Sequence, residues 1–370
     1  MTMRILVHSW RDLQHPEAGG AEHYIVRVCE GLAARGHEVT IRTASYAGSV
    51  PEDRHNDVRY IRRGGRLTIY PIALGRQAVR RRDADVVIDI QNGMPYLSPL
   101  VSRLPTVNLV HHVHREQWAY LFGPRMSRLG WFLESSVATR VYDGHTYVAV
   151  SGSTKSELVR LGVRQDRIHV IPNGTDPWTG PVTSRSPGPR LVTLGRLVPQ
   201  KRFEFAIDAL AALVPDLPSV VLDVAGSGWW EDQLRHYAAE AGVVDRVVFH
   251  GHVSEAEKHA LLAQAWVHLM PSVKEGWGLV VAEAGLHGTP TVAFRHAGGP
   301  SDSVRDGRTG LLVDEDSSEA FTRATRTLAL GSEMRARMDL EVRDWVRQFE
   351  WEQSVTMWER LLHQVVHAAN

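Results

Sequence analysis

Residues 267–286, VHLMPSVKEGWGLVVAEAGL, join a strand, a loop and a helix in immediate succession. The apolar run 267–270 predicts a buried strand, and a helical pattern begins near Leu279. Gly276 and Gly278 lie between them, where glycine lets the backbone approach a ligand closely. The first amides of the helix would point their N–H groups at the same place. The segment therefore predicts one strand–loop–helix unit of an α/β fold, with an anion site at the end of the strand.

The alternation of strand and helix continues on both sides of this segment. Short apolar runs followed by helical patterns predict parallel sheets with helices on their faces. The expected strands are 4–8, 38–43, 85–90, 107–110, 146–150, 168–171, 190–194, 220–225, 247–250 and 291–294. Helices are expected before Gly36 and at 151–161, 203–214, 231–241 and 255–263.

A stretch rich in proline and glycine, 172–189, divides this alternation into two halves. Such a composition is typical of a flexible linker. We therefore expect an N-terminal domain over 1–171 and a C-terminal domain over 190–350, each with a doubly wound sheet. The last helix, 351–370, carries an apolar stripe and is expected to pack back on the first domain.

The composition narrows the classes of function. The chain has 370 residues with 42 basic and 42 acidic side chains, so its formal net charge is zero. That balance argues against a protein whose main partner is nucleic acid. The single cysteine, Cys29, rules out an intramolecular disulfide. The start does not look like a signal peptide, and no apolar run reaches about 18 residues. The sequence therefore predicts a cytoplasmic protein, as a monomer or a homodimer.

Two carboxylates belong to the opening segment. Glu275 lies in its glycine-containing loop, and Glu283 lies on its helix one turn in, facing the same side. Carboxylates are good acceptors for the paired hydroxyls of a sugar or a ribose. The alternative for each is an ordinary solvated charge.

Two further stretches suit an anion. Arg196 and Lys201 follow the strand 190–194 and would bring two cations to the start of a helix. Two cations suit a diphosphate leaving group and could replace a metal ion. Gly19 and Gly20 open the first helix, which is again an anion-compatible N-terminus. The alternatives are a basic helix start and an ordinary glycine turn.

Taken together, these segments resemble the retaining glycosyltransferases of family 4, and the resemblance covers nearly the whole chain. It implies the GT-B fold, two Rossmann-like domains facing a central cleft. The most specific match is the pair Glu275 and Glu283, separated by seven residues. The other matches are Pro172-Asn-Gly-Thr-Asp, Gly195-Arg-Leu with Lys201, Ala225-Gly-Ser-Gly and His296-Ala-Gly-Gly-Pro. The sequence departs from the pattern at Trp277, where phenylalanine is more usual.

The resemblance implies a role for each matched residue. Glu283 should hold the ribose hydroxyls of a nucleotide-sugar donor, and Glu275 should hold the donor sugar. Arg196 and Lys201 should neutralise the diphosphate. The donor-binding residues that it implies are Gly19, Gly20, Gly226, Gly228, Gly276, Trp277, Gly278, Leu279 and Glu283.

Three histidines follow the strand 107–110. Family members carry a histidine beside the anomeric centre at this place, and His111 matches it best. His112 and His114 remain candidates on the acceptor side. Neighbouring histidines also suggest zinc. On a strand, however, His112 would point away from the other two, and no carboxylate or cysteine follows at a ligand spacing. We therefore expect neither a metal nor any other cofactor.

The predicted reaction is metal-independent transfer of a sugar from a nucleotide-diphosphate sugar to an acceptor hydroxyl, with retention of the anomeric configuration. The acceptor could be a polysaccharide, a lipid-linked sugar or a small natural product. Two alternatives stay open: a nucleotide-sugar epimerase of the same fold, and a catalytically silent sugar-binding subunit.

Peripheral contact with the inner face of a membrane also stays open, because basic and aromatic segments can rest on anionic lipid. The basic residues are Arg62, Arg63, Arg66, Arg76, Arg80, Arg81 and Arg82, and the apolar ones are Trp118, Tyr120, Leu121, Phe122, Trp131 and Phe132. The alternative is a solvated basic face beside ordinary core aromatics.

Overall fold

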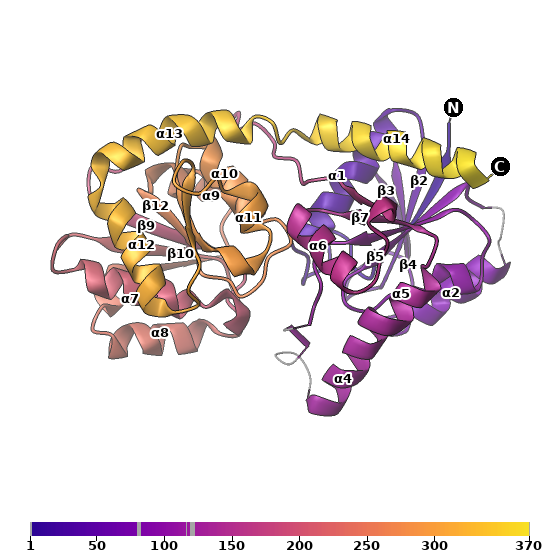
Figure 1. Ribbon diagram of the computed structural model, residues 1–370, viewed down its shortest axis with the longest axis horizontal. Helices are drawn as coiled ribbons and strands as arrows, with labels where there is room; N and C mark the ends of the chain where they lie inside the picture. The colour runs from indigo at the N-terminus through magenta and orange to yellow at the C-terminus, as the bar shows by residue number, and fades with distance from the viewer. Residues whose placement is uncertain (1, 80–82, 116, 119–122, 370) are drawn as a thin grey trace. The chain divides into compact units, whose positions relative to one another are not determined.

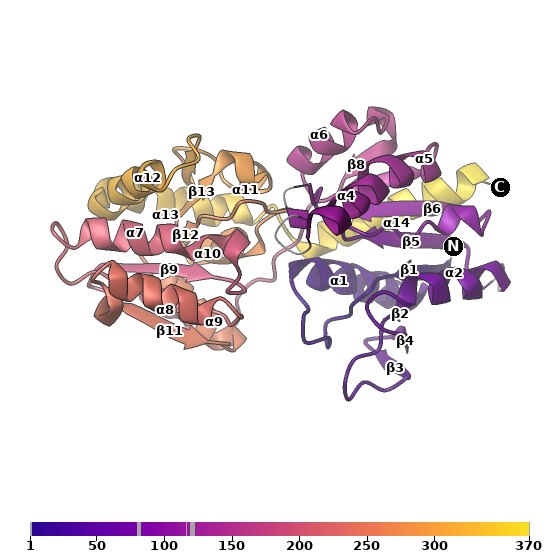
Figure 2. The same cartoon turned by 90° about the horizontal axis from the view of Figure 1, so that it is seen from below.

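The computed structural model of the chain consists of two compact units (Figure 1). It describes residues 2–79, 83–115, 117–118 and 123–369. The first unit comprises Met1–Gly174 and Glu350–Asn370, and the second comprises Thr175–Phe349. Both units contain a sheet with helices on its faces (Figure 2), so the α/β prediction is confirmed.

The first unit contains an eight-stranded sheet with the order β3-β4-β2-β1-β5-β6-β7-β8. Its strands are β1 (Arg4–His8), β2 (Glu38–Thr43), β3 (Glu52–His55), β4 (Val58–Arg62), β5 (Val86–Gln91), β6 (Thr106–Val110), β7 (Thr146–Ala149) and β8 (Ile168–Val170). All neighbours pair in parallel except β3 and β4, which form a hairpin. Every residue of β5 is buried, because helices cover both faces of a parallel sheet.

The helices of this unit are α1 (Gly20–Ala34), α2 (Ile69–Val79), α4 (Pro124–Phe132), α5 (Ala138–Val141), α6 (Gly152–Arg160) and α14 (Trp351–Ala369). A π-helical turn, Leu133–Val137, joins α4 to α5. The C-terminal helix α14 lies beside α1 (Figure 1). Trp358 of α14 is fully buried and donates a hydrogen bond from Nε1 to the hydroxyl of Tyr24, at 2.7 Å. Gly31 of α1 makes room for Val355, because a Cβ there would lie 2.4 Å from the valine side chain.

The second unit contains a six-stranded parallel sheet with the order β11-β10-β9-β12-β13-β14. Its strands are β9 (Arg190–Leu194), β10 (Val221–Ala225), β11 (Val247–Gly251), β12 (Val267–Met270), β13 (Thr291–Phe294) and β14 (Gly310–Val313). Its helices are α7 (Phe203–Leu213), α8 (Glu231–Glu240), α9 (Glu255–Gln264), α10 (Leu279–Leu286), α11 (Pro300–Ser303), α12 (Ser318–Leu330) and α13 (Ser332–Val346). The strand order reverses between β9 and β12. In open α/β sheets, ligands bind beyond the carboxyl ends of the strands at such a point.

The stretch that the sequence suggested as a flexible linker is anchored to the second unit. Arg185 forms an ion pair with Asp339 at 2.8 Å and donates to the carbonyl oxygen of Gly288 at 3.0 Å. Trp178 stacks on His259, with 4.1 Å between the ring centroids. These contacts join Trp178 and Arg185 to the second unit, although the composition of the stretch is that of a loop.

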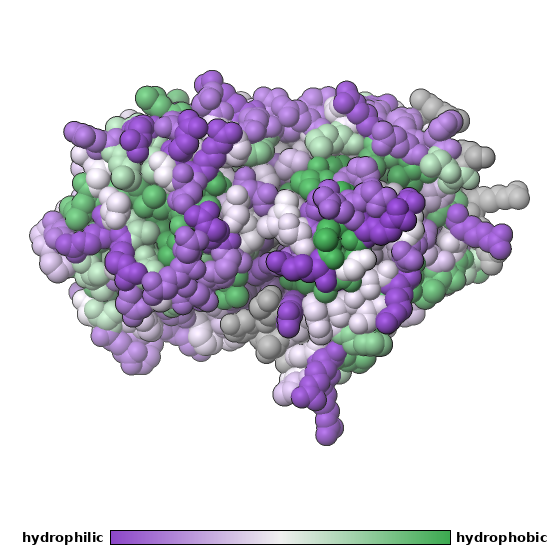
Figure 3. Space-filling model, in the orientation of Figure 1, coloured by the Kyte–Doolittle hydropathy of each residue, from purple (hydrophilic) through white to green (hydrophobic). Residues whose placement is uncertain are grey.

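Hydrophilic side chains cover most of the face shown in Figure 3, and apolar side chains form small areas between them. Among the described residues, no helix combines the length and the hydropathy that crossing a bilayer requires.

Candidate active site

Three loops meet beyond the carboxyl ends of β9, β12 and β13. The backbone N–H of Glu275 donates to the carbonyl oxygen of Ala297 at 2.8 Å, and the N–H of Gly299 donates to the carbonyl oxygen of Glu275 at 3.0 Å. On the other side, the N–H of Val273 donates to the carbonyl oxygen of Gln200 at 3.0 Å. The loop that carries Glu275 is thus held between its two neighbours by backbone hydrogen bonds.

The glycines of these loops are required by close backbone contacts. A Cβ on Gly299 would lie 2.5 Å from the backbone nitrogen of Trp277, so the two loops could not approach as they do. Gly278 is the N-cap residue of α10 and has a φ of +86°, a conformation that side chains disfavour. The loop therefore delivers the first amides of α10 to the carboxyl edge of the sheet. Three other residues predicted to bind the donor lie in or beside this turn: Gly276, Trp277 and Leu279.

The structure brings together two of the predicted catalytic residues. Lys201 ends the short 3-10 turn after β9, and its Nζ forms an ion pair with Oε1 of Glu275. Both side chains are partly buried, with 22% of Lys201 and 14% of Glu275 exposed. The site therefore carries a cation and an acceptor carboxylate at the switch point of the sheet.

Glu283 lies on α10 and is paired with a lysine that the sequence analysis did not identify. Nζ of Lys258, on α9, lies 2.7 Å from Oε1 of Glu283 and 2.7 Å from Oε2 of Glu255. Burial lowers the pKa of Lys258, but the two carboxylates more than offset this and raise the pKa above its ordinary value. Lys258 is therefore a cation at neutral pH. No spacing rule connects Lys258 with Glu283, because the pairing depends on how α9 packs against α10.

Arg196 is exposed and makes no hydrogen bond or ion pair with any residue that the structure describes. The structure thus shows no hydrogen bond or ion pair between Arg196 and either Lys201 or Glu275. Two of the predicted donor-binding residues, Gly226 and Gly228, lie against the loop that carries Arg196. A Cβ on Gly226 would lie 1.9 Å from the carbonyl oxygen of Gly195, and one on Gly228 would lie 2.1 Å from that of Leu197. Close packing therefore requires glycine at both positions. Donor binding would be a second role for the same residues.

In the first unit, Gly19 and Gly20 open α1 as predicted, but the first turn already contains a carboxylate. Oε2 of Glu22 accepts a hydrogen bond from the N–H of Gly19 at 2.8 Å. Oε1 of Glu22 accepts another from Nε of Arg11 at 3.0 Å, and both side chains are buried. An internal ion pair therefore occupies this helix start.

His111 directly follows β6 and is buried beneath the edge of Tyr24, with 5.4 Å between the ring centroids. Its carbonyl oxygen accepts a hydrogen bond from Oγ1 of Thr154 at 2.9 Å. Burial is the main cause that lowers the pKa of His111 to about 3, with smaller contributions from His114 and Arg11. The imidazole is therefore neutral at pH 7. Its Nε2 has no hydrogen-bond partner among the described residues.

The expected separation of His112 from His114 is wrong. The strand ends at Val110, so the alternation of a strand does not apply, and the two rings lie 4.1 Å apart between centroids. His114 contacts Oδ1 of Asn92 through Nε2 at 2.9 Å and Oε1 of Glu134 through Nδ1 at 3.0 Å. The sequence analysis did not identify Asn92 and Glu134 as partners of His114. Asn92 follows strand β5 and Glu134 lies in the π-helical turn, so both are distant from His114 in sequence.

Among the described residues, the grouping with metal-ligand geometry is His37, Glu359 and His363, far from the predicted site residues in sequence. Nδ1 of His37 accepts a hydrogen bond from the backbone N–H of Met3 at 3.1 Å. The proton of the neutral ring therefore lies on Nε2, which contacts Glu359 at 3.1 Å. Both ring nitrogens of His37 thus have hydrogen-bond partners in the protein.

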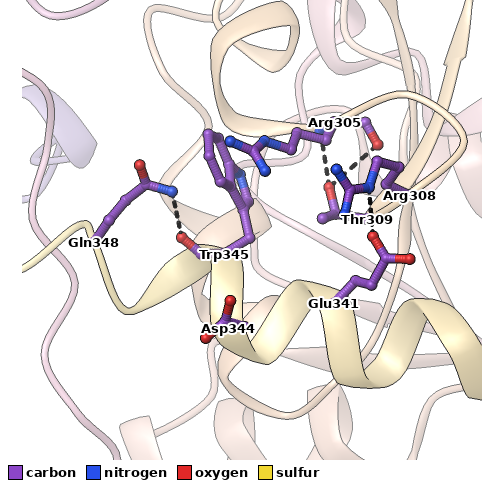
Figure 4. A pocket seen from close by; sticks show the side chains of 7 residues that line it. All are labelled: Arg305, Arg308, Thr309, Glu341, Asp344, Trp345 and Gln348. Atoms are coloured by element: carbon purple, nitrogen blue, oxygen red, sulfur yellow. Dashed lines mark hydrogen bonds and ion pairs between the residues drawn. The ribbon is translucent and has the colours of Figure 1, made fainter.

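Two cavities in the described part of the chain lie apart from the predicted site residues. One, of about 290 Å³, lies between the loop after α11 and the helix α13 (Figure 4), and it is lined by Arg305, Arg308, Thr309, Glu341, Asp344, Trp345 and Gln348. Within it, the guanidinium of Arg305 packs 3.8 Å from the ring centroid of Trp345. The other, of about 390 Å³, lies beside α8. None of the predicted site residues lines either cavity.

The basic segment proposed for a membrane surface needs one correction. Arg62 is 1% exposed, and its Nε donates to Oδ2 of Asp12 at 2.6 Å, so it belongs to the interior. Arg66 is exposed, with its guanidinium 5.2 Å from the ring centroid of Trp10. Six of the residues named for this surface lie outside the described residues: Arg80, Arg81, Arg82, Tyr120, Leu121 and Phe122.

The chain has two Rossmann-like units, and Glu275 lies in a loop where the strand order of the second sheet reverses. This architecture is that of the GT-B glycosyltransferases. Residues 179–345 match the model described as glycosyl transferases group 1, and residues 18–178 match that of glycosyltransferase family 4. The two matches are consecutive and together span most of the chain. The protein is thus a glycosyltransferase and belongs to family 4.

Named relatives agree with this assignment. The chain is 28% identical over 362 residues to a GDP-mannose-dependent α-(1-6)-phosphatidylinositol monomannoside mannosyltransferase of Mycolicibacterium smegmatis, covering 91% of this chain and 92% of the relative. The fold of this chain is similar to that of sucrose-phosphate synthase of Thermosynechococcus elongatus, with a TM-score of 0.82, 21% identity and 99% of both chains covered. HepE of Anabaena, solved in complex with UDP-glucose, has a TM-score of 0.76 and 19% identity, covering 98% of this chain and 100% of that one.

Proposed function

We propose that this protein transfers a sugar from a nucleotide-diphosphate sugar to an acceptor hydroxyl, with retention of configuration and without a metal ion, and that the second unit binds the donor. The ion pair between Lys201 and Glu275 carries the proposal. It lies where the strand order reverses, beside the first amides of α10. Cations and helix amides stabilise a diphosphate in the place that a metal would otherwise take.

The chemical demand is charge separation. The bond between the anomeric carbon and the diphosphate oxygen breaks, and the bond to the acceptor oxygen forms on the same face of the sugar. The acceptor proton passes to the departing phosphate. Lys201 exchanges the carboxylate of Glu275 for the phosphate, and Glu275 then accepts hydrogen bonds from the donor sugar. Arg196 is exposed and unpaired among the described residues, so it can reach a phosphate without breaking a contact.

His111 is assigned to the reacting face of the sugar. Its Nε2 is buried without a partner among the described residues, which is costly for a polar atom unless a ligand supplies one. A neutral ring can exchange a hydrogen bond with a sugar hydroxyl without adding charge. His112 and His114 remain assigned to the acceptor side. Glu283 is assigned to the ribose.

The test is a donor panel. The protein is incubated with UDP-, GDP-, ADP- and dTDP-sugars, with polysaccharide, lipid-linked sugar or small-molecule acceptors, and nucleoside diphosphate release is measured with and without EDTA. We expect release that depends on an acceptor and resists EDTA, with an α-linked product from an α-linked donor by NMR. A β-linked product would exclude retention, and loss of turnover in EDTA would exclude the metal-independent mechanism. Conversion of the donor without an acceptor would instead favour an epimerase.

We also propose that the protein works in the cytoplasm with peripheral membrane contact through α4. Its apolar side chains Met126, Leu129 and Phe132 are 55%, 47% and 52% exposed. Arg125 and Arg128 are exposed on the same helix. Apolar and cationic side chains together suit an anionic bilayer. Flotation with anionic vesicles tests this, and we expect a variant with serine at the three apolar positions to lose binding. No flotation of the unmodified protein would reject the contact.

A further inference from the structure

Each carboxylate of the Glu-x7-Glu pair is held by a lysine from a different element. Lys201 holds Glu275, and Lys258 holds Glu283. The first lysine belongs to the diphosphate machinery proposed above. The second has no part in that account, although its side chain is only 12% exposed. Burying an ammonium group has a free-energy cost, so a partly buried lysine with two carboxylate partners calls for an explanation.

The pair leaves one oxygen of Glu283 unused. Oε1 contacts Nζ of Lys258, whereas Oε2 accepts no hydrogen bond from a residue that the structure describes. The Glu283 side chain is 20% exposed, so this oxygen can meet a ligand. A glutamate side chain has three rotatable bonds, and fixing one oxygen restricts where the other points. Lys258 thereby orients the acceptor atom that a ligand would use.

The helix that carries Lys258 is itself well fixed. Leu261 and Leu262, three and four positions further along α9, are buried and pack with Ala284 of α10. This spacing places all three α9 side chains on the face toward α10. Next to Lys258, His259 contacts Nε2 of His287 through Nδ1 at 2.7 Å. The contacts between α9 and α10 thus fix the backbone that carries Lys258, as a residue that orients another requires.

We propose that Lys258 is a positioning residue that orients Glu283 toward the paired hydroxyls of the donor ribose, and so makes the site select ribonucleotides over 2′-deoxyribonucleotides. This inference rests on the proposed function, which assigns the ribose to Glu283. Without Lys258 the carboxylate can rotate away, and a ligand must spend binding free energy on ordering it. A deoxyribose offers one hydroxyl fewer, so it gains less from the ordered carboxylate.

The experiment compares four single variants of the full-length chain. Lys258→Met removes the charge at similar length, and Lys258→Arg keeps a cation. Glu283→Gln removes the carboxylate. Glu255→Gln is the matched control, because it removes the other ion pair of Lys258, with a side chain that is 76% exposed, and leaves the pair with Glu283 in place. Calorimetry measures the affinity of each for UDP and 2′-deoxy-UDP, or for GDP and 2′-deoxy-GDP, whichever base the unmodified protein binds.

We expect the unmodified protein to prefer the ribonucleotide about tenfold or more, since a hydrogen bond to a charged group is involved. Lys258→Met and Glu283→Gln should reduce this preference toward equality, by weakening the binding of the ribonucleotide more than that of the deoxyribonucleotide. Lys258→Arg and Glu255→Gln should retain it. In turnover, Lys258→Met should raise KM for the donor more than it lowers kcat, because the ribose is remote from the reacting carbon.

Three results would overturn the inference while leaving the proposed function intact. They are equal binding of the two nucleotides by the unmodified protein, an unchanged preference in Lys258→Met, or an equal loss of affinity for both nucleotides in that variant. If Lys258→Met does not fold, as judged by its melting curve, Lys258→Gln takes its place under the same criteria. Failure of the unmodified protein to bind any nucleoside diphosphate would overturn the proposed function as well.

Discussion

Lys201 and Glu275 come from loops that follow different strands, and they neutralise each other in the second unit. A diphosphate that enters this site must take Lys201 away from a partner that already satisfies it. The resting site therefore carries less net positive charge than the predicted cations alone would suggest. The free energy needed to separate the pair is part of the cost of binding a donor.

Replacing Glu275 with glutamine should separate affinity from catalysis. Lys201 loses its carboxylate partner, so affinity for a nucleoside diphosphate without sugar should rise by about two- to fivefold, the range of a weak ion pair. The donor sugar loses a charged acceptor, so kcat should fall by roughly 10- to 100-fold. Calorimetry and turnover measure the two effects. Weaker diphosphate binding in this variant would contradict the proposed exchange.

Replacing Lys201 with alanine should lower kcat by about 10²- to 10³-fold, because the charge that develops on the departing diphosphate loses its stabilising cation. Circular dichroism should show an intact fold. Arg164→Ala is the matched control, since Arg164 is 62% exposed and its ion-pair partner among the described residues is the equally exposed Asp166. Turnover near the normal rate in Lys201→Ala would remove this lysine from the mechanism.

The second unit should lose stability in mild acid through His268. Burial is the main cause that lowers the pKa of His268 to about 3, and Lys201 adds to it. The unfolded chain binds a proton below pH 6.5, whereas the folded unit does not until about pH 3. The unfolding free energy therefore falls as the pH drops through this window, by about 1.4 kcal/mol per pH unit for this group.

Urea unfolding at pH 6.5, 5.5 and 4.5 measures this dependence. His268→Asn removes the titrating ring, so the unfolding free energy of the second unit should depend less steeply on pH. His236→Asn is the control, since that ring is 76% exposed. Equal slopes for His268→Asn and the unmodified protein would show that the buried ring does not control acid stability.

Gly228→Ala should disturb the loop before Lys201. The added Cβ would lie 2.1 Å from the carbonyl oxygen of Leu197, and backbone on both sides leaves little room to yield. We expect a loss of about 1–3 kcal/mol in stability, as for overpacked cores, together with weaker nucleotide binding. Gly188→Ala is the control, because a Cβ there would lie more than 4 Å from every described residue apart from its two chain neighbours. A melting temperature equal to that of the control would contradict the close approach.

The elements that the sequence predicted best are those whose signal lies within one short stretch of residues. The ranges 190–194, 267–270 and 291–294 are confirmed residue for residue, because buried parallel strands appear as short apolar runs. The hairpin of β3 and β4 was missed, since Glu52–His55 is mostly exposed and its strand conformation depends on pairing with its neighbour.

Some residues of the candidate site could be predicted from local sequence, and others could not. Glu275 and Lys201 follow strand ends, where local pattern and family resemblance both point, and the structure places them together. Lys258 and Glu134 have no such signal, because their contacts with Glu283 and His114 depend on helix packing and on a π-helical turn. Partners that are distant in sequence leave no periodicity to detect.

The first unit is not continuous along the chain, because its sheet comes from the beginning and α14 comes from the end. Trp358 and Val355 of α14 contact Tyr24 and Gly31 of α1. Residues 175–349 of the second unit emerge from the ribosome before α14 does, so the second unit can complete its core before the first unit receives this helix. Removal of α14 should therefore destabilise the first unit, whose other elements lie ahead of the second unit in the chain.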